Sequence, residues 1–463
     1  MKSQAEILER IPLFEDRHLP MLRRILENNH APRWNAMCGD RLVSSDLPAL
    51  RAFEVSLRKS RNVPASGWSE EESIRFIENM ALRSPWFQRV FEDRSRDFAS
   101  IPSMRREDLV HRLHEIVPLD ADLSRLVLNP TSGTTGMPVQ VPNDPLGVAH
   151  YQPLILEALS RHGIERRPGT DDMAAVQICS QRSTMTYGTV HAAYGGAGFA
   201  KINIAPGGRQ SLLSEWNSLS GPDAFLQELQ PFILTGDPFA FRIYMDYNVD
   251  YRPSAVLSTA STLSMELRKE MEEYFQCPVV NMYSTNESGP IAASCAQHPD
   301  RFHILAPDIR LETLASSQSL NFDDSGASGT VHITGGRNPL LPLLRYDTGD
   351  LATWTPESCS CGASGYLRGL TGRPLVLFRD MDGHCVNPLD FARLLRFVPL
   401  RRHRLLQQSD GSLDMYLDPG PFDLSVYRDE IIRKSAEILG ELTVRIHPWS
   451  EEVAGDYPYR VVA

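Results

Sequence analysis

The chain has 463 residues, of which 42% are hydrophobic and 23% are charged, the composition of a soluble globular protein with two or three packed units. Its formal net charge of −11 excludes a general attraction to nucleic acid or to an anionic membrane surface. The sequence also lacks an uninterrupted apolar stretch of about 20 residues, the length that spans a bilayer.

The first residues, MKSQAEILERIPLF, carry charges within their apolar run and have no small-residue cleavage site, so we expect no signal peptide. Seven cysteines, an odd number in a long chain without such a signal, favour free thiols in a reducing compartment. We therefore expect a cytoplasmic protein, either a monomer or a homodimer.

Residues 1 to about 115 are mostly helical by pattern, because apolar side chains recur at helical spacing. Ser69 is a candidate N-cap, since three glutamates follow it. We expect this region to form a helical layer that packs on another part of the protein. Its predicted helices are Leu19–Asn28, Leu47–Arg58, Glu70–Leu82 and Trp86–Asp93.

From about residue 125 to 350, short β-rich runs alternate with helical stretches. The alternation predicts an α/β fold, with mixed or parallel β-sheets flanked by helices. The predicted strands are Ala174–Ile178, Ala200–Ile204, Pro231–Thr235, Val279–Met282 and Gly329–Thr334. The predicted helices are Gly147–His162, Ser211–Leu219 and Ser264–Phe275.

The Gly/Pro-rich segment Gly369–Pro374 predicts a domain boundary. We expect a large N-terminal domain of several subdomains at residues 1–372 and a small α+β lid at residues 373–463. Within the lid, the pattern predicts helices at Pro388–Phe397 and Leu424–Leu439 and strands at Ser412–Leu417 and Leu442–Pro448.

A Gly/Thr-rich loop directly follows the apolar run Leu126–Leu128. Backbone N–H groups of glycines and hydroxyls of Ser and Thr are donors that grip phosphate, although an ordinary turn is the alternative. The loop is not a Walker A loop, because its glycines are three residues apart and no Lys-Ser/Thr pair follows. Its residues are Thr131, Ser132, Gly133, Thr134, Thr135 and Gly136.

Two later loops each carry a carboxylate that suits one end of a nucleotide. Glu287 follows the predicted strand Val279–Met282, and a single carboxylate at a strand end is suited to hold Mg²⁺. Asp350 ends the segment Leu344–Asp350, where a carboxylate can accept hydrogen bonds from a ribose diol. In the same segment Arg345 is a candidate to neutralise phosphate.

Together these segments resemble the core motifs of the adenylate-forming superfamily, which contains acyl-CoA synthetases, peptide-synthetase adenylation domains and luciferases. The motifs are T-S-G-T-T-G-M-P, Y-S-T-N-E-S-G, R-Y-D-T-G-D and a G-R pair at residues 372 and 373. The chain is more narrowly similar to the phenylacetate-CoA ligase branch. It shares with this branch the helical N-terminal portion, the short length and the motif L-L-R-Y-D-T-G-D. The resemblance runs from about residue 70 to 400.

The resemblance implies that a carboxylate attacks the α-phosphate of ATP, giving acyl-AMP and pyrophosphate. Positioning and charge neutralisation suffice for this step, so no nucleophilic side chain is required. The implied roles are β- and γ-phosphate contacts for Thr131–Gly136, Mg²⁺ binding for Glu287, α-phosphate contact for Thr285 beside Ser284, adenine stacking for Tyr283, ribose binding for Asp350, and ribose or phosphate binding for Arg373.

The resemblance further implies that residues 180–198 and 258–262 line the acyl pocket. Aromatic walls with small residues favour a flat, aromatic or short acid over a long chain. His191 could orient a polar group of the substrate, although a core histidine is the alternative. The candidate substrate-binding residues are Tyr187, His191, Tyr194, Ser258 and Ala260.

A second group of residues has the ligand types of a zinc site. Cys359 and Cys361 form a C-x-C pair, and Cys295 with a downstream histidine could complete four N/S ligands, with buried free thiols as the alternative. The resemblance favours His303 over His298 as the fourth ligand. Four protein ligands would make the zinc structural, pinning the loop after Glu287 to the one after Asp350.

Two features depart from the family pattern. No lysine follows Lys434, although family members carry one near the C-terminus, and Arg460 is not its equivalent. The Gly372-Arg373 pair is followed by Pro374 in place of a charged hinge residue. Three functions stay open: transfer of the acyl group to a thiol of CoA or carrier-protein pantetheine, transfer to an amine, or a catalytically degraded nucleotide-binding scaffold.

Overall fold

The computed structural model describes residues 3–60, 67–92, 98–130, 139–205, 209–246, 251–306, 308–314, 328–450 and 457–462. The Thr131–Gly136 loop lies outside these residues. Among the described residues, none of the helices combines the length and the apolarity that crossing a membrane requires.

The N-terminal region is helical, as its apolar spacing predicts. At α4 the Ser69 side chain accepts a hydrogen bond from the Glu72 N–H, while the Glu72 carboxylate accepts one from the Ser69 N–H at 2.7 Å. This capping box explains why the helix begins at Glu70. The helices are α1 (Gln4–Arg10), α2 (Leu19–Leu26), α3 (Leu47–Ser60), α4 (Glu70–Ala81), α5 (Pro85–Glu92), α6 (Arg106–His111) and α7 (Leu113–Ile116).

The central region alternates strands and helices, which confirms the predicted α/β class. Its strands are β1 (Val127–Pro130), β2 (Gln140–Asn143), β3 (Met173–Cys179), β4 (Tyr187–His191), β5 (Ala197–Asn203), β6 (Ile233–Gly236), β7 (Ala255–Ser258), β8 (Val279–Thr285), β9 (Gly289–Ser294), β10 (Arg301–Ile304), β11 (Ile309–Leu314), β12 (Gly329–Gly335), β13 (Leu343–Ser358) and β14 (Ser364–Thr371). Its helices are α8 (Pro145–Ala149), α9 (Tyr151–Ser160), α10 (Gly221–Leu229), α11 (Pro238–Asp246) and α12 (Met265–Phe275).

Twelve of these strands form one mixed sheet, in the order β11-β12-β13-β14-β10-β9-β8-β7-β6-β3-β5-β4. The neighbours β8, β7, β6, β3 and β5 run parallel, and the other pairs are antiparallel. Because the carboxyl ends of parallel strands meet at one edge of a sheet, the loops that follow these five strands share that edge.

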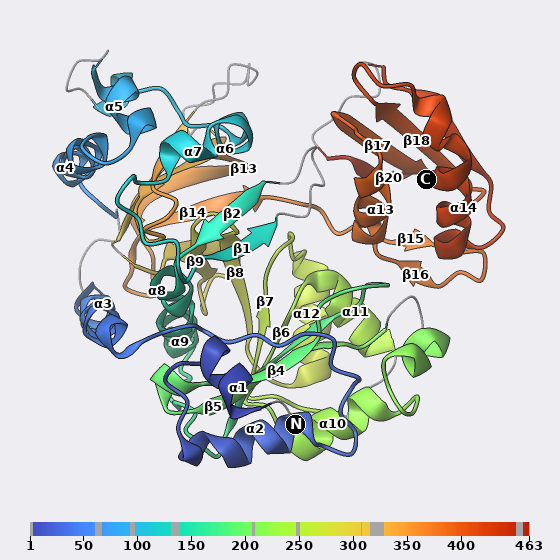
Figure 1. The fold of residues 1–463 in the computed structure, drawn as a ribbon, viewed down its shortest axis with the longest axis horizontal. Coiled ribbons are helices and arrows are strands. Elements are labelled where there is room, and N and C mark those ends of the chain that lie inside the picture. Colours follow the sequence, from blue (N-terminus) through green and yellow to red (C-terminus); the bar gives the residue numbers. More distant parts are fainter. Residues whose placement is uncertain are drawn as a thin grey trace.

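Helices cover the sheet by burying apolar faces against its strands. On the parallel part, α2, α10, α11 and α12 pack on one face, and α3 and α9 pack on the other. Helices α4 to α7 pack against β11 to β14, so the helical N-terminal region covers the antiparallel part of the sheet (Figure 1).

One predicted helix, Ser211–Leu219, is wrong. Residues 209–214 form a 3-10 helix followed by turns, and the α-helix begins only at Gly221, with Pro222 in its first turn. Trp216 explains the difference, because its buried indole N–H donates to the Asn203 carbonyl oxygen at 2.8 Å. This tertiary contact overrides a local preference for helix.

The C-terminal residues form a unit with its own four-stranded sheet, in the order β19-β18-β17-β20, and its own apolar core. It lies beside the body of the molecule, in orange and red in Figure 1. The Asn387 side-chain amide donates to the Ser180 carbonyl oxygen at 3.0 Å, which joins this unit to the end of β3. Its elements are β15 (Phe378–Arg379), β16 (Cys385–Val386), α13 (Pro388–Leu394), β17 (Arg402–Gln407), β18 (Leu413–Asp418), α14 (Arg428–Leu439), β19 (Val444–Pro448) and β20 (Tyr459–Val461).

Candidate functional site

Glu287 lies in the tight turn between β8 and β9, at the shared carboxyl edge of the parallel strands. Its side chain is buried and accepts a hydrogen bond from the Tyr346 hydroxyl at 3.2 Å. The turn is held from behind by the buried guanidinium of Arg337, which donates to the Ser288 carbonyl oxygen at 3.2 Å and pairs with Asp308 at 2.6 Å. These contacts fix the carboxylate in one place.

Hydroxyl groups surround the carboxyl end of β8. Thr285 Oγ1 accepts a hydrogen bond from the Ser288 N–H at 3.1 Å, and Ser284 Oγ lies 2.9 Å from Thr259 Oγ1. The hydroxyl of Ser258, at the end of β7, is buried and makes no hydrogen bond within the described part of the chain. The ends of β7 and β8 thus gather hydrogen-bonding groups that neither titrate nor carry charge at neutral pH.

Tyr283 and Asp350 meet in this site although they come from different parts of the chain. The Tyr283 hydroxyl donates to Asp350 Oδ2 at 2.9 Å and lies 3.2 Å from Thr348 Oγ1. Burial raises the pKa of Asp350 to about 6, while the Tyr283 hydrogen bond and the Arg373 charge act in the opposite direction. Sequence reasoning assigned Tyr283 to the adenine and missed this contact with the predicted ribose carboxylate.

The Gly372-Arg373 pair lies against Asp350 and the loop after β7. The Thr262 N–H donates to the Arg373 carbonyl oxygen at 2.7 Å, and the Gly372 N–H donates to Thr262 Oγ1 at 3.1 Å. A Cβ atom at Gly372 would lie 3.0 Å from Asp350 Oδ1, so a larger residue would press on the carboxylate. Ala260, in the same loop, has a positive φ of 74°.

The structure separates the five candidate substrate-binding residues into groups. Tyr187 and His191 lie on β4 with their rings 6.0 and 5.5 Å from the ring of Phe199. The Tyr194 hydroxyl instead donates to the Ala149 carbonyl oxygen at 2.8 Å, and this side chain packs near α3 and α8.

Ser258, at the end of β7, and Ala260, in the loop after it, lie several strands away from β4 in the sheet. Three strands separate β7 from β4, and with neighbouring strands about 4.8 Å apart the backbones of the two groups are about 19 Å apart. The five residues therefore do not form one continuous wall. Ser258 and Ala260 adjoin the predicted nucleotide site, and Tyr187 and His191 lie far from it.

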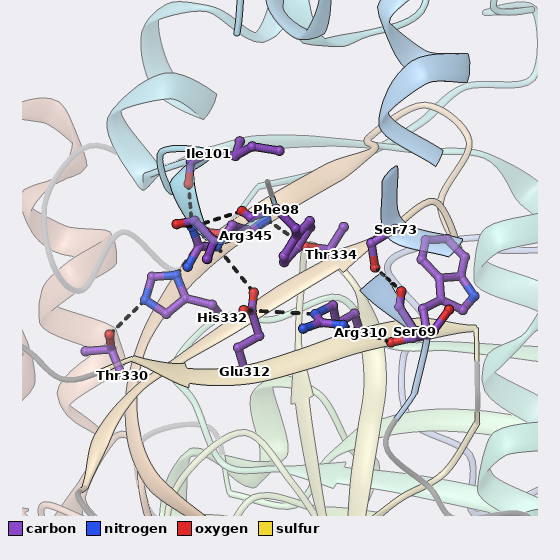
Figure 2. A network of polar contacts seen from close by, with 12 residues as sticks. Ser69, Ser73, Phe98, Ile101, Arg310, Glu312, Thr330, His332, Thr334 and Arg345 are labelled. Carbon is purple, nitrogen blue, oxygen red and sulfur yellow. Dashed lines mark hydrogen bonds and ion pairs between the residues drawn. The ribbon is translucent and has the colours of Figure 1, made fainter. Parts of the chain in front are cut away.

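The expectation that Arg345 neutralises phosphate is wrong. Its side chain is buried and donates to the carbonyl oxygens of Ala99 at 2.8 Å and of Ile101, and its Nε lies 3.3 Å from the Glu312 carboxylate (Figure 2). Arg345 has a positive φ of 45° at an irregular pairing of β12 with β13, and its side chain faces the segment around Phe98, while the neighbouring Tyr346 hydroxyl reaches Glu287. The arginine anchors the segment around Phe98 to β13.

The predicted zinc ligands Cys295, His303, Cys359 and Cys361 gather in one cluster, with their ligand atoms within 4.8 Å of one another. The sulfurs of Cys295 and Cys359 are 4.0 Å apart, and Cys361 Sγ lies 3.3 Å from His303 Nε2. A tetrahedral zinc with bonds of about 2.0–2.3 Å separates its ligand atoms by about 3.3–3.8 Å. The spacing of the four residues fits that geometry.

The orientation of His303 also suits a metal. Its Nδ1 lies 3.0 Å from the Gly365 carbonyl oxygen, which can only accept, so Nδ1–H donates and Nε2 is left facing the cysteines. His298, the competing candidate, lies outside the cluster with its Nε2 2.6 Å from Ser360 Oγ. The four clustered residues connect the strands that follow Glu287 to the hairpin between β13 and β14.

Both the sequence and the fold of this chain are similar to those of known proteins. No protein-family model matches the chain. A phenylacetate-coenzyme A ligase of Thermus thermophilus is 23% identical over 377 residues, covering 74% of this chain and 78% of the relative.

Among solved structures, 2-hydroxyisobutyryl-CoA ligase in complex with 2-HIB-AMP and CoA, in the thioesterification state, matches with a TM-score of 0.53 at 16% identity. The match covers 93% of this chain and 96% of that one. Its fold is shared with this protein. Sequence relative and fold together confirm the resemblance of this chain to the phenylacetate-CoA ligase branch of the adenylate-forming superfamily.

Proposed function

We propose that this protein uses ATP to convert a small carboxylic acid into an acyl adenylate, releasing pyrophosphate, and then transfers the acyl group to the thiol of CoA. The observation that most supports this function is the meeting of Glu287, Tyr283 and Asp350 at the carboxyl edge of the parallel strands. The sequence relative and the structural neighbour are both CoA ligases by name, which supports CoA as the acceptor.

In this proposal each residue acts by position and charge. With a pKa of about 6, Asp350 is ionised at neutral pH and can accept hydrogen bonds from both ribose hydroxyls. Thr285 offers its hydroxyl to the α-phosphate, Tyr283 lies beside the adenine, and Arg373 lies at the ribose or phosphate. The Thr131–Gly136 loop grips the β- and γ-phosphates.

Glu287 is the residue that would hold Mg²⁺. A single fixed carboxylate that leaves the remaining positions to water and phosphate oxygens is the protein contribution that this ion prefers. The ion would supply neutralisation of the phosphate charge. The carboxylate itself is fixed by Tyr346, which restricts where the bound phosphates can lie.

We also propose that Cys295, His303, Cys359 and Cys361 bind a structural zinc ion, because four protein ligands leave no open position for catalysis. The domain boundary at residue 372 is likewise a proposal. It is supported by the separate apolar core of residues 376–459 and by the end of β14 at Thr371.

Pyrophosphate exchange into ATP tests the proposed function. Purified protein with ATP and Mg²⁺ is expected to catalyse exchange when aromatic and small acids are supplied one at a time. Adding CoA, a carrier protein or an amine to the active mixture and identifying the acyl product then distinguishes the acceptors. Bound ATP without exchange for any acid would support the scaffold function instead.

A further inference from the structure

The loop after β3, residues 180–186, is held in place by side chains, because it contains no helix or strand of its own. The buried amide of Asn203 binds both backbone groups of Gln181, donating to the carbonyl oxygen at 2.6 Å and accepting from the N–H at 3.2 Å. The Asn35 amide likewise accepts from the Thr186 N–H at 2.8 Å. Backbone groups shielded from water need such partners, so the conformation of this loop depends on the side chains around it.

Two further partners of the loop come from the C-terminal unit. The Asn387 side-chain amide donates to the Ser180 carbonyl oxygen at 3.0 Å, and Asp390 Oδ1 accepts from the Arg182 N–H at 3.0 Å. The Asn387 and Asp390 side chains are both buried. Breaking a buried hydrogen bond without replacing it leaves a polar group unpaired, which is costly. Helix α13 is thus fastened to the body of the protein at two neighbouring points.

Asn387 has a second role at the start of α13. Its Oδ1 accepts from the Leu389 N–H at 3.0 Å, which caps the helix. The cap uses the oxygen of the side-chain amide, whereas the contact with Ser180 uses its NH2 group. Substitution can therefore separate the two roles, since an aspartate caps a helix about as well as an asparagine but has no hydrogen to donate when ionised.

The fastened loop lies at the edge of the sheet that carries the predicted reaction centre. Through the pairs of β6 and β7, Gln177 on β3 is level with Val280 on β8. Three residues further on, Ser180 is level with Tyr283, two residues before Thr285. Three strand spacings of about 4.8 Å across and two residues of about 3.3 Å along the strand place Ser180 about 16 Å from Thr285.

The C-terminal unit extends along this edge from the hinge to α13. At the hinge, the Arg373 carbonyl oxygen accepts a hydrogen bond of 2.7 Å from the loop after β7. Burial raises the pKa of Tyr457 to about 12, and the charges of Arg373 and Asp237 also act on it, so this side chain lies near both, beside the end of β6. Asn387 reaches the loop after β3. The unit therefore spans the ends of β7, β6 and β3, next to the end of β8.

We propose that Asn387 and Asp390 hold the C-terminal unit closed over the acyl adenylate, so that water does not consume this intermediate before the acceptor thiol arrives. This inference rests on the proposed function. When water adds to the acyl carbon of an acyl adenylate, the bond from that carbon to the phosphate oxygen breaks, AMP leaves, and the free acid and a proton are formed. A closed lid suppresses this side reaction by excluding water. Asn387 and Asp390 are positioning residues, which act by holding the unit on the loop.

Release of AMP in the absence of an acceptor tests the proposal. Purified protein is given ATP, Mg²⁺ and an acid that supports pyrophosphate exchange, without CoA, and the rate of AMP release is divided by the rate of exchange. Loss of folded protein lowers both rates and leaves their ratio unchanged. Asn387→Asp keeps the cap of α13 and loses the donor to Ser180, so we expect the ratio to rise by about 5- to 10-fold, the effect of one buried hydrogen bond. Asn387→Ser also keeps a capping oxygen, adds no charge and is expected to give the same rise.

The matched control is a helix cap in the same unit that makes no contact with the loop after β3. Asp423 is exposed and accepts from the Ser425 N–H at 2.9 Å, at the start of the 3-10 helix Leu424–Tyr427, and Asp423→Ser is expected to leave the ratio unchanged.

The uncharged variant Asn387→Ser decides the outcome. A raised ratio in this variant supports the proposal. An unchanged ratio overturns it and leaves the proposed function intact, even if the ratio rises in Asn387→Asp, because that rise would then come from the added charge. Wild-type protein that exchanges pyrophosphate with no acid overturns the proposed function and this inference with it.

Discussion

The Tyr283 hydroxyl donates a hydrogen bond of 2.9 Å to the Asp350 carboxylate, which joins β8 to β13. Three strands, β9, β10 and β14, separate these two in the sheet order. In a flat sheet their backbones would be about 19 Å apart, so the antiparallel part of the sheet must curl back over the end of β8. This curl brings the two predicted nucleotide-binding motifs together.

The first prediction concerns this hydrogen bond. Tyr283→Phe removes an interaction that lowers the pKa of Asp350, so this pKa is expected to rise above its wild-type value of about 6. A protonated Asp350 can no longer accept from both ribose hydroxyls. Calorimetric titration with ATP is therefore expected to show weaker binding in the variant near pH 6.5, by several-fold, and a smaller difference at pH 9. A pH-independent difference would contradict the assigned role.

Asp390 gives a prediction about stability. Its Oδ1 accepts the Arg182 N–H at 3.0 Å, and burial raises its pKa from the ordinary 3.8 to about 6. The folded protein thus binds this proton more tightly than the unfolded chain, and the free energy of unfolding falls as the pH rises from about 4 to about 6. The loss is at most about 3 kcal/mol, since one pKa unit corresponds to about 1.4 kcal/mol.

Asp390→Asn keeps an acceptor for the Arg182 N–H and removes the buried charge. Its Tm at pH 8 is expected to exceed that of the wild-type protein by about 2–4 °C, and at pH 4 the two values are expected to coincide. Thermal unfolding followed by circular dichroism at both pH values checks this. A lower Tm of the variant at pH 8 would mean that the ionised carboxylate stabilises the contact.

Sequence periodicity was sufficient to predict the helices that bury one apolar face. Helices α2 to α5 lie within two residues of their predicted ends, because their apolar spacing and the Ser69 cap are local signals. The order of the sheet strands and the curl at β13 depend on contacts between distant segments, which no local pattern records. Trp216 shows the same limit, since its contact with the Asn203 carbonyl oxygen replaced a predicted helix.

The site was predictable where motif residues act through their own side chains, as with the clustered Cys295 and His303. Residues that act by holding others, such as Tyr346 behind Glu287, carry no separate signal in the sequence. Arg345 was misassigned because its motif does not reveal which face of β13 it points from. Its positive φ of 45° and the irregular pairing of β12 with β13 mean that simple alternation along the strand does not give its direction.

Arg345 carries a prediction about the N-terminal helical region. Arg345→Met removes the donors of the Ala99 and Ile101 carbonyl oxygens and leaves Glu312 without this partner, at an expected cost of about 3–5 kcal/mol (Figure 2). Arg345→Lys is expected to lose a similar amount of stability, because a single ammonium cannot reproduce the planar fork of donors of the guanidinium. Denaturant unfolding measures the loss. Arg17→Met, at an exposed surface position, is the control and is expected to change little.

The cluster of Cys295, His303, Cys359 and Cys361 predicts that the purified protein contains about one zinc ion per chain. His303→Ala is expected to abolish zinc binding and to lower the Tm, because the remaining three ligands cannot close a tetrahedral site. His298→Ala is the matched control and is expected to retain the metal, since that histidine contacts Ser360 outside the cluster. Elemental analysis of both variants decides between the two histidines. Wild-type protein without zinc would reject the metal site.

Glu287 is the residue on which the proposed chemistry depends most. Glu287→Gln keeps an acceptor for the Tyr346 hydroxyl but removes the charge that would hold Mg²⁺. We expect ATP binding without Mg²⁺ to persist in this variant, while acid-dependent pyrophosphate exchange falls by about 100-fold or more. Ser288→Ala, in the same turn, is the control for disturbance of the backbone.

Acid-dependent exchange of pyrophosphate into ATP, compared between the wild-type protein and Glu287→Gln, tests adenylate formation most directly. The proposed function predicts exchange by the wild-type protein with at least one aromatic or small acid, no exchange without acid, and near-complete loss in the variant. Wild-type protein that binds ATP but exchanges pyrophosphate with no acid, or a variant as active as wild type, would contradict it.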